Sequence, residues 1–257
     1  MKNEIDKAFE ITKKEKRPAL ISFTVAGDNT SKKSFEILKS ISNTVDIAEW
    51  GIAFNCPGAD GPEIQNSSYR AIKNGITLDS TFSLIKKYKK LRNSKPLILM
   101  GYYQLIYNYG EKKFIKKCKN VGVAGLIVVD LPWPDNKSFA KLCKKNSICF
   151  VQLIAPTTTK KRMKLIVKDS HQLIYQISNI NITGGKLKST AKTILKNYQI
   201  IKKINPTKNV IIGFGITKDT IADFKRANGL VVGSACCKVI SNAIKNGLNP
   251  AKKLNNM

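Results

Sequence analysis

The sequence predicts a single (β/α)8 barrel, or TIM barrel, over residues 1–257, with an extra helix at its N-terminus. The 257 residues are 42% hydrophobic, and this content is spread evenly without a Gly/Ser-rich or Pro-rich linker, which favours one domain with one large core. Eight short apolar runs alternate with amphipathic segments. Eight strands alternating with helices over about 250 residues is the pattern expected of this barrel.

Strands are predicted where a short run, rich in β-branched residues, is apolar at nearly every position. Such runs are typical of parallel strands whose two faces are both covered. The eight predicted strands are ALISFTV (19–25), VDIAE (45–49), PLILM (96–100), GLIVVD (125–130), ICFVQLI (148–154), QLIYQI (172–177), NVIIG (209–213) and GLVVG (229–233).

Helices are predicted between the strands, where apolar residues recur at helical spacing and lysines occupy the other face. They include SKKSFEILKSI (31–41), TFSLIKKYKKLR (81–92), EKKFIKKCKNVG (111–122), NKSFAKLCKKN (136–146), STAKTILKNYQIIKKI (189–204) and KDTIADFKRANG (218–229). Near the N-terminus, Ile5, Ala8 and Phe9, with Ile11 as a further candidate, share one face of a helix that would close the barrel floor. A doubly wound open sheet is the structural alternative, and the count of eight strands argues against it.

The charge balance is strongly basic, with 45 lysines and arginines against 17 acids and a net charge of +28. Arginine is rare among these residues, and lysines recur in almost every polar segment. Grooves for nucleic acid more often use arginine forks with interleaved aromatic residues. The composition therefore indicates solvated helix faces and no specific nucleic-acid site.

Two further classes are disfavoured by the sequence. No stretch reaches the ~18 uncharged apolar residues of a membrane span, and MKNEIDKAFEITKKEKR is charged where a signal peptide would be apolar. The six cysteines form no C-x-x-C pair, and His171 is the single histidine, so a metal site is not expected. We expect a soluble, cytoplasmic protein with reduced thiols, with Cys236 and Cys237 in packing roles and His171 on the face of the barrel that serves stability.

Function in such barrels lies at the carboxyl ends of the strands. Glycine-rich segments follow the last three predicted strands, and a helix begins after the final one. Backbone N–H groups and a helix N-terminus in this position suit a phosphate monoester. The residues in question are Thr183, Gly184, Gly185, Gly213, Gly215, Gly233 and Ser234.

Two carboxylates stand at the same end of the predicted barrel. Glu49 ends the second strand among apolar neighbours, where desolvation would raise its pKa toward neutrality. Asp60 follows in a Gly/Pro loop, where it would more easily stay ionised. Two carboxyl groups in different environments suit divided acid and base roles. Structural roles remain open from spacing alone, with Asp46 or Glu49 as a salt-bridge partner of a lysine and Asp60 as a turn residue.

The segment VDIAEWGIAFNCPGADGPEIQ (45–65) resembles the signature of the tryptophan synthase α subunit family. That signature is a strand ending in Glu, then Gly-x-x-Phe, then Pro-x-Ala-Asp-Gly-Pro-x-Ile-Gln. The resemblance extends over nearly the whole chain. It includes SFTVAGD (22–28) with Phe23, LMGYYQ (99–104) with Tyr102, VVDLP (128–132), Tyr175, Thr183-Gly184, and the glycine segments GFGI and GSACCKVI.

The resemblance implies a lyase that cleaves indole-3-glycerol phosphate to indole and glyceraldehyde 3-phosphate in L-tryptophan biosynthesis. It implies that Glu49 makes both proton transfers and that Asp60 is the partner of the indole N–H. The ring would be lined by Phe23, Tyr102 and Tyr175, and the phosphate held by Thr183, Gly184, Gly215, Gly233 and Ser234. No metal or bound cofactor would be needed in this chain.

A partner is also implied, namely a PLP-bearing β subunit that joins indole to serine in an αββα heterotetramer. By resemblance, Cys56, Pro57 and Asn108 are expected at the interface. The sequence departs from the family at Asn55-Cys56, where Ser-Asp is usual, and at Asn181, where a glycine is usual. These departures fall on loop positions, so they bear on coupling to the partner more than on the chemistry.

Two other functions stay open at this stage. One is another sugar-phosphate reaction on the same barrel, such as an isomerisation in histidine biosynthesis. Barrels of that kind usually carry Asp at the ends of strands 1 and 5, and ICFVQLIAP (148–156) offers none. The other is a chain without turnover of its own that acts as an activating partner of the β subunit.

Overall fold

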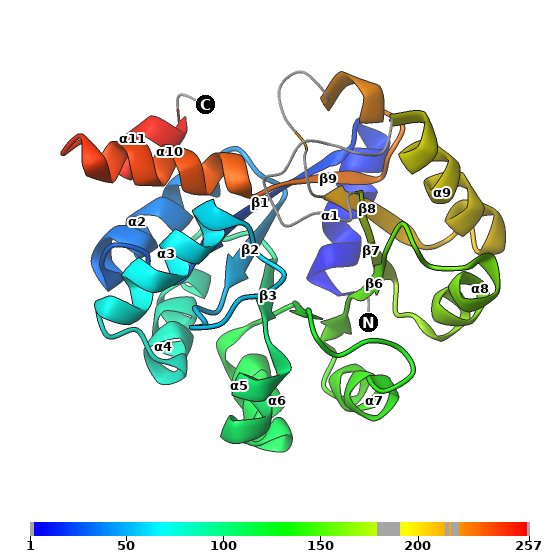
Figure 1. Cartoon of the computed structure of the whole chain (residues 1–257), viewed down its shortest axis with the longest axis horizontal. Helices are drawn as coiled ribbons and strands as arrows, with labels where there is room; N and C mark the ends of the chain where they lie inside the picture. The colour runs from blue at the N-terminus through cyan, green and yellow to red at the C-terminus, as the bar shows by residue number, and fades with distance from the viewer. Residues whose placement is uncertain (1–2, 179–190, 214–215, 217–220, 256–257) are drawn as a thin grey trace.

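The computed structural model describes residues 3–178, 191–213, 216 and 221–255, and within them it forms a barrel of parallel strands (Figure 1). The strands are β1 (Ala19–Val25), β2 (Ile47–Gly51), β3 (Leu97–Gly101), β4 (Gly125–Val128), β5 (Cys149–Phe150), β6 (Gln152–Ile154), β7 (Leu173–Ile177), β8 (Asn209–Gly213) and β9 (Gly229–Val232). They pair in the order β5-β4-β3-β2-β1-β9-β8-β7-β6. The predicted fold class is confirmed.

The fifth predicted strand closes the barrel, but it is broken in the middle. β5 pairs with β4, and β6 pairs with β7 on the other side. Val151, between them, donates its N–H to the carbonyl of Leu126 at 2.9 Å. The two outer strands of the sheet are thus halves of one segment, and the eight predicted strands become nine.

Helices cover the outside of the barrel (Figure 1). They are α1 (Glu4–Lys14), α2 (Ser31–Ile41), α3 (Pro62–Lys73), α4 (Leu78–Lys89), α5 (Tyr103–Tyr109), α6 (Glu111–Val121), α7 (Lys137–Lys145), α8 (Lys160–Asp169), α9 (Ala191–Ile204), α10 (Ser234–Lys245) and α11 (Pro250–Asn255). The helix predicted over 218–229 is wrong for the described part of that range. A four-residue 3-10 helix, Ile221–Phe224, stands there, and β9 begins at Gly229.

The apolar side chains form an inner cluster and two outer clusters. The inner cluster contains inward residues of the strands, among them Ile21, Phe23, Ile47 and Tyr175. One outer cluster lies under α2, α4, α6 and α7, and the other lies under α8 and α9. Both faces of the strands are therefore buried, which is why the strand sequences do not alternate.

The helix α1 closes the floor of the barrel, as predicted. Its N-cap Asn3 forms a capping box with Asp6, and Ile5, Ala8 and Phe9 are buried. Gly125 at the start of β4 leaves room for Ile5, because a Cβ at this glycine would stand 2.8 Å from Ile5 Cδ1. Ile11 is 54% exposed, so its expected place on the buried face is wrong.

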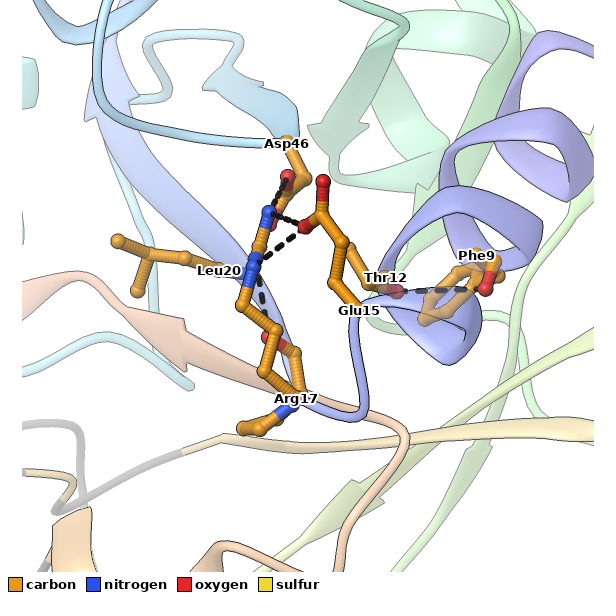
Figure 2. Close-up of polar contacts among 7 residues, drawn as sticks. Phe9, Thr12, Glu15, Arg17, Leu20 and Asp46 are labelled. Atoms are coloured by element: carbon orange, nitrogen blue, oxygen red, sulfur yellow. Dashed lines mark hydrogen bonds and ion pairs between the residues drawn. The ribbon is translucent and has the colours of Figure 1, made fainter.

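An ion pair ties the segment after α1 to the start of β2 (Figure 2). Arg17 holds Asp46 through two hydrogen bonds of 2.7 and 2.9 Å, and Glu15 through one of 2.7 Å. Asp46 also accepts the N–H of Leu20 at 2.8 Å. Burial acts to raise the pKa of Asp46, but the bonds from Arg17 and Leu20 outweigh it and hold this pKa below its usual value. The suggested salt bridge of Asp46 exists, with an arginine instead of a lysine.

Across the described residues, no helix is long and apolar enough to cross a membrane.

Candidate active site

Glu49 lies within β2 and points into the barrel. Its Cα is in register with Phe23 of β1 and Ile98 of β3, both of the inner cluster. The residue is 1% exposed, and its Oε2 has no hydrogen-bond partner among the described residues. Burial, and secondly the charge of Asp60, raise the pKa of Glu49 to about 8. The prediction that Glu49 ends the second strand is wrong: β2 continues to Gly51, so Glu49 is held by regular pairing on both sides.

Asp60 lies in the loop after β2 and is also buried, at 4% exposure. A turn sets its backbone, with Asp60 N–H donating to Pro57 O at 2.9 Å, and Gln65 Nε2 donating to Asp60 O at 2.8 Å. Its Oδ2 accepts the hydroxyl of Tyr102 at 3.1 Å, while Oδ1 has no partner among the described residues. Burial raises the pKa of Asp60 to about 6, and the bond from Tyr102 opposes that rise.

The two carboxyl groups therefore differ in protonation near neutral pH. A pKa of about 8 keeps Glu49 mostly protonated at pH 7, and a pKa of about 6 keeps Asp60 mostly ionised. The pKa of Asp60 nonetheless rises, because the loop buries its side chain more than a Gly/Pro turn suggests. Since the charge of Asp60 acts on Glu49, the two groups titrate as a coupled pair.

Tyr102 organises the loop that carries Asp60. Its hydroxyl donates to Asp60 and accepts the N–H of Ala59 at 3.1 Å. Phe54 stacks on the tyrosine ring, with centroids 4.8 Å apart and an interplanar angle of 24°. The sequence suggested only that this ring lines a substrate. The contacts to Asp60 and Ala59 were missed, since no local pattern signals them.

Phe23 and Tyr175 lie in the inner cluster with these carboxyl groups nearby. Each aromatic ring packs against a glycine: a Cβ at Gly51 would stand 2.6 Å from the Phe23 ring, and one at Gly213 would stand 1.9 Å from the Tyr175 hydroxyl oxygen. Burial, followed by the charges of Glu49 and Asp60, raises the pKa of Tyr175. The structure thus brings both acids and both rings together inside the barrel.

The predicted phosphate residues are only partly described. Thr183, Gly184, Gly185 and Gly215 lie outside the described residues, as does Asn181. Gly233 is the N-cap of α10 and Ser234 is its first residue, both half-buried. A Cβ at Gly233 would stand 3.4 Å from Phe23 Cβ, so this helix start adjoins the aromatic part of the site. The first turn of α10 offers backbone N–H groups and a positive dipole end that suit an anion.

The residues expected at an interface lie outside the barrel interior. Cys56 is exposed and Pro57 is half-buried in the loop between β2 and α3, and Asn108 is exposed on α5. Tyr107, beside Asn108, is 68% exposed. These segments follow β2 and β3, so they stand at the carboxyl end of the strands.

The surroundings of the remaining candidates, two cysteines and the histidine, indicate structural roles. Cys236 and Cys237 are buried, and burial raises the pKa of both thiols, so neither is an activated nucleophile. His171 lies just before β7, at the amino end of the strands, and its Nδ1 accepts the N–H of Phe150 at 2.9 Å. No group of three metal-ligating side chains occurs in the part of the chain that the structure describes.

Comparisons with known proteins agree with this geometry. The sequence profile of a family described as "Tryptophan synthase alpha chain" matches residues 9–257. A tryptophan synthase alpha chain of Pelagibacter ubique (strain HTCC1062) is 58% identical over 253 residues, covering 98% of this chain and 96% of that protein. One from Thermoanaerobacter sp. (strain X514) is 36% identical over 246 residues, covering 93% and 91%.

Solved structures of tryptophan synthase chains share this fold. The tryptophan synthase subunit alpha of Legionella pneumophila str. Paris superposes with a TM-score of 0.90 at 26% identity, over 100% of this chain and 96% of that one. A chain from the tryptophan synthase a2b2 complex of Pyrococcus furiosus superposes with a TM-score of 0.84 at 32% identity, over 93% and 96%.

Proposed function

Because the chain belongs to the tryptophan synthase alpha chain family, and so is a lyase that cleaves indole-3-glycerol phosphate to indole and glyceraldehyde 3-phosphate, we propose that Glu49 and Asp60 perform this cleavage. The reaction is a retro-aldol cleavage. The indole C3 carbon gains a proton, and the hydroxyl on the glycerol carbon attached to C3 loses one. The bond between these two carbons breaks. The electrons of that bond return to the ring as the hydroxyl carbon becomes an aldehyde.

Glu49 is the proton carrier in this proposal. Its carboxyl group first donates to C3, and the resulting carboxylate then accepts the hydroxyl proton, so the residue ends the cycle as it began. The observation that carries the proposal is the burial of Glu49, which raises its pKa to about 8 and keeps the donor form at neutral pH. A general acid with a pKa near the working pH is the most effective one.

Asp60 supplies the fixed negative charge. Protonation of C3 places positive charge on the ring nitrogen, and a carboxylate that accepts the N–H would stabilise it. Its lower pKa, about 6, supports the ionised form, and Tyr102 orients the group through Oδ2 while leaving Oδ1 for the substrate.

The rest of the substrate is bound by the neighbouring residues. Phe23 and Tyr175, with the ring of Tyr102, would enclose the indole. The phosphate would be held by Thr183, Gly184, Gly215, Gly233 and Ser234, with binding and orientation as their contribution. On this proposal the proton transfers need no metal or cofactor in the chain.

A β subunit is the proposed partner, in an αββα heterotetramer with PLP on the β chain. The a2b2 complex of Pyrococcus furiosus supports a β partner, and we place Cys56, Pro57 and Asn108 at the contact. The same proposal treats residues 1–257 as one domain and the protein as cytoplasmic.

Indole release by the purified chain, with and without a β subunit, tests the assignment. Glu49→Gln should lower kcat by about 100-fold or more, since acid–base groups contribute about that much. Asp60→Asn should also lower kcat. Asp46→Asn is the matched control, because it makes the same chemical change outside the proposed site, and it should leave kcat unchanged. Circular dichroism would verify the fold of each variant. Turnover of Glu49→Gln equal to that of the unaltered chain would refute the role of Glu49 and favour a merely activating chain.

A further inference from the structure

A cavity of about 650 Å³ opens on the floor of the barrel, at the opposite end from the carboxyl groups described above. Its walls come from the residues just before β4, β5, β7 and β8 and from the start of α1. The side chains that determine its charge are the basic residues Lys119, Lys144, His171 and Lys208 and the acids Glu4 and Asp6, which all line the cavity. None of these residues belongs to the candidate active site.

Lys208 is buried against this cavity, with 8% exposure. Its Nζ donates to the carbonyl of Ser170 at 2.6 Å and to that of His171 at 3.0 Å. An ammonium group has three donors, so one N–H remains for a further acceptor. Lys144, at the end of α7, and Lys119, at the end of α6, also line the cavity and are exposed. No ion pair involves these three lysines among the residues described here.

The two acids of the cavity already have partners. Glu4 Oε2 stands 2.7 Å from Lys89 Nζ, outside the cavity. Asp6 Oδ2 accepts the N–H of Asn3 at 3.3 Å as part of the cap of α1. The cavity lining thus holds three lysines against two acids, one of which is paired with Lys89, so an excess of positive charge remains among the described residues.

The pKa of His171 responds to the charges around this cavity. Its Nδ1 accepts the N–H of Phe150 at 2.9 Å, which favours the neutral ring. Burial, then Lys144 and Lys208, lower the pKa of this imidazole. Around it, α1 contributes Glu4 and Asp6, α6 contributes Lys119, α7 contributes Lys144, and β5 contributes Cys149. Burial is the largest cause of this lowered pKa, the two lysine charges add to it, and backbone hydrogen bonds with Ala140 and Ile148 oppose it.

We propose that this floor cavity binds a small oxyanion of the phosphate class, held by Lys144 and Lys208 with Lys119 at the rim. A dianion with several acceptor oxygens matches several ammonium donors better than a single carboxylate does. The ligand is either inorganic phosphate or the phosphoryl group of a small metabolite, because the cavity is large enough for both. A bound anion would offset the positive charge of Lys144, at the end of α7, and of Lys208, just before β8.

His171 is the one histidine of the sequence, so its NMR signal reports on this cavity alone. The NMR titration of His171 is followed in the full chain with inorganic phosphate, and in chloride at the same ionic strength, so that screening is equal in both. Bound phosphate should raise the His171 midpoint by about half a pH unit, because a nearby anion favours imidazolium. A parallel series with glycerol 3-phosphate identifies the source: a larger shift at equal concentration assigns the site to phosphate esters, an equal one to free phosphate.

Two variants locate the binding. Lys144→Gln should raise the His171 midpoint in chloride and abolish the response to phosphate. Lys145→Gln, on the neighbouring exposed position of α7 that does not line the cavity, should keep that response. Equal midpoints in phosphate and chloride, or a full response in Lys144→Gln, would overturn the proposal. Indole release is measured separately, so this result does not depend on the assignment of Glu49 and Asp60.

Discussion

The hydroxyl of Tyr102 stands 3.1 Å from Oδ2 of Asp60. The two residues are 42 positions apart in sequence, one in the loop after β2 and the other directly after β3. The same hydroxyl oxygen accepts the N–H of Ala59, so one side chain fixes both the carboxylate and the backbone that carries it. Tyr102 is therefore a positioning residue for Asp60.

Removing this hydroxyl should weaken catalysis without unfolding the barrel. In Tyr102→Phe, kcat/KM should fall by about 10-fold or more, since hydrogen bonds to charged groups contribute about 1.5–3 kcal/mol. The pKa of Asp60 should rise, because the bond that opposes its rise is lost. Tyr69→Phe, which removes a hydroxyl from a side chain 66% exposed on α3, is the matched control. An unchanged pH profile in Tyr102→Phe would contradict the positioning role.

The pH dependence of kcat/KM should be bell-shaped, with limbs near 6 and 8. Below about 6, Asp60 becomes protonated and loses its charge, and above about 8, Glu49 loses the proton that it would donate in the proposed reaction. In Asp60→Asn the acidic limb should vanish from the residual activity. The alkaline limb should move to lower pH, because the charge of Asp60 helps to raise the pKa of Glu49. An alkaline limb that stays in place would show that the two groups are not coupled.

Gly213 should not tolerate a side chain. A Cβ there would lie 1.9 Å from the Tyr175 hydroxyl oxygen, so Gly213→Ala must displace this ring. We expect a loss of about 1–3 kcal/mol in the free energy of unfolding, as for overpacked cores, together with a higher KM. Urea unfolding and indole-release kinetics measure the two effects. Tyr175→Leu in the Gly213→Ala background removes the clashing atoms and should restore part of the stability, whereas no recovery would place the strain elsewhere.

The ion pair between Arg17 and Asp46 should affect stability and not turnover. Asp46→Asn should lower the free energy of unfolding by about 1 kcal/mol at pH 7, a modest value because Arg17 is partly exposed. The folded-state pKa of Asp46 lies below its unfolded value, so its contribution is present above the unfolded pKa. It is lost as the pH falls through the lower, folded-state pKa. Urea titrations at neutral and acidic pH should show the difference between the proteins shrinking in acid, and a constant difference would exclude ionisation as its source.

Much of the barrel could be predicted because each strand carries its own signal. The β-branched run at 209–213 and the run at 19–25 coincide with β8 and β1. The interruption at Val151 could not be predicted, because the run at 148–154 is apolar at nearly every position and shows no sign of a break. The short helices α5 and α11 were not identified, because one or two turns contain too few residues to show a periodicity.

The candidate site divides in the same way. Glu49 and Asp60 could be found because a carboxylate beside an apolar run, and another in a Gly/Pro loop, are unusual in a lysine-rich chain. The depth of burial of Asp60, and hence its raised pKa, depends on how Phe54 and Tyr102 fold the loop over it. Those contacts join residues far apart in sequence, so only the three-dimensional structure reveals them.

The register that sets Glu49 between Phe23 and Ile98 makes its acid strength a shared property of three strands. Natural selection can then adjust the reactivity of this carboxyl without replacing it, by changing the volume or polarity of Ile98, a neighbour outside the proposed substrate site. Related enzymes with an identical glutamate would then differ in the pH at which they work best. The substitutions responsible would lie among buried core residues.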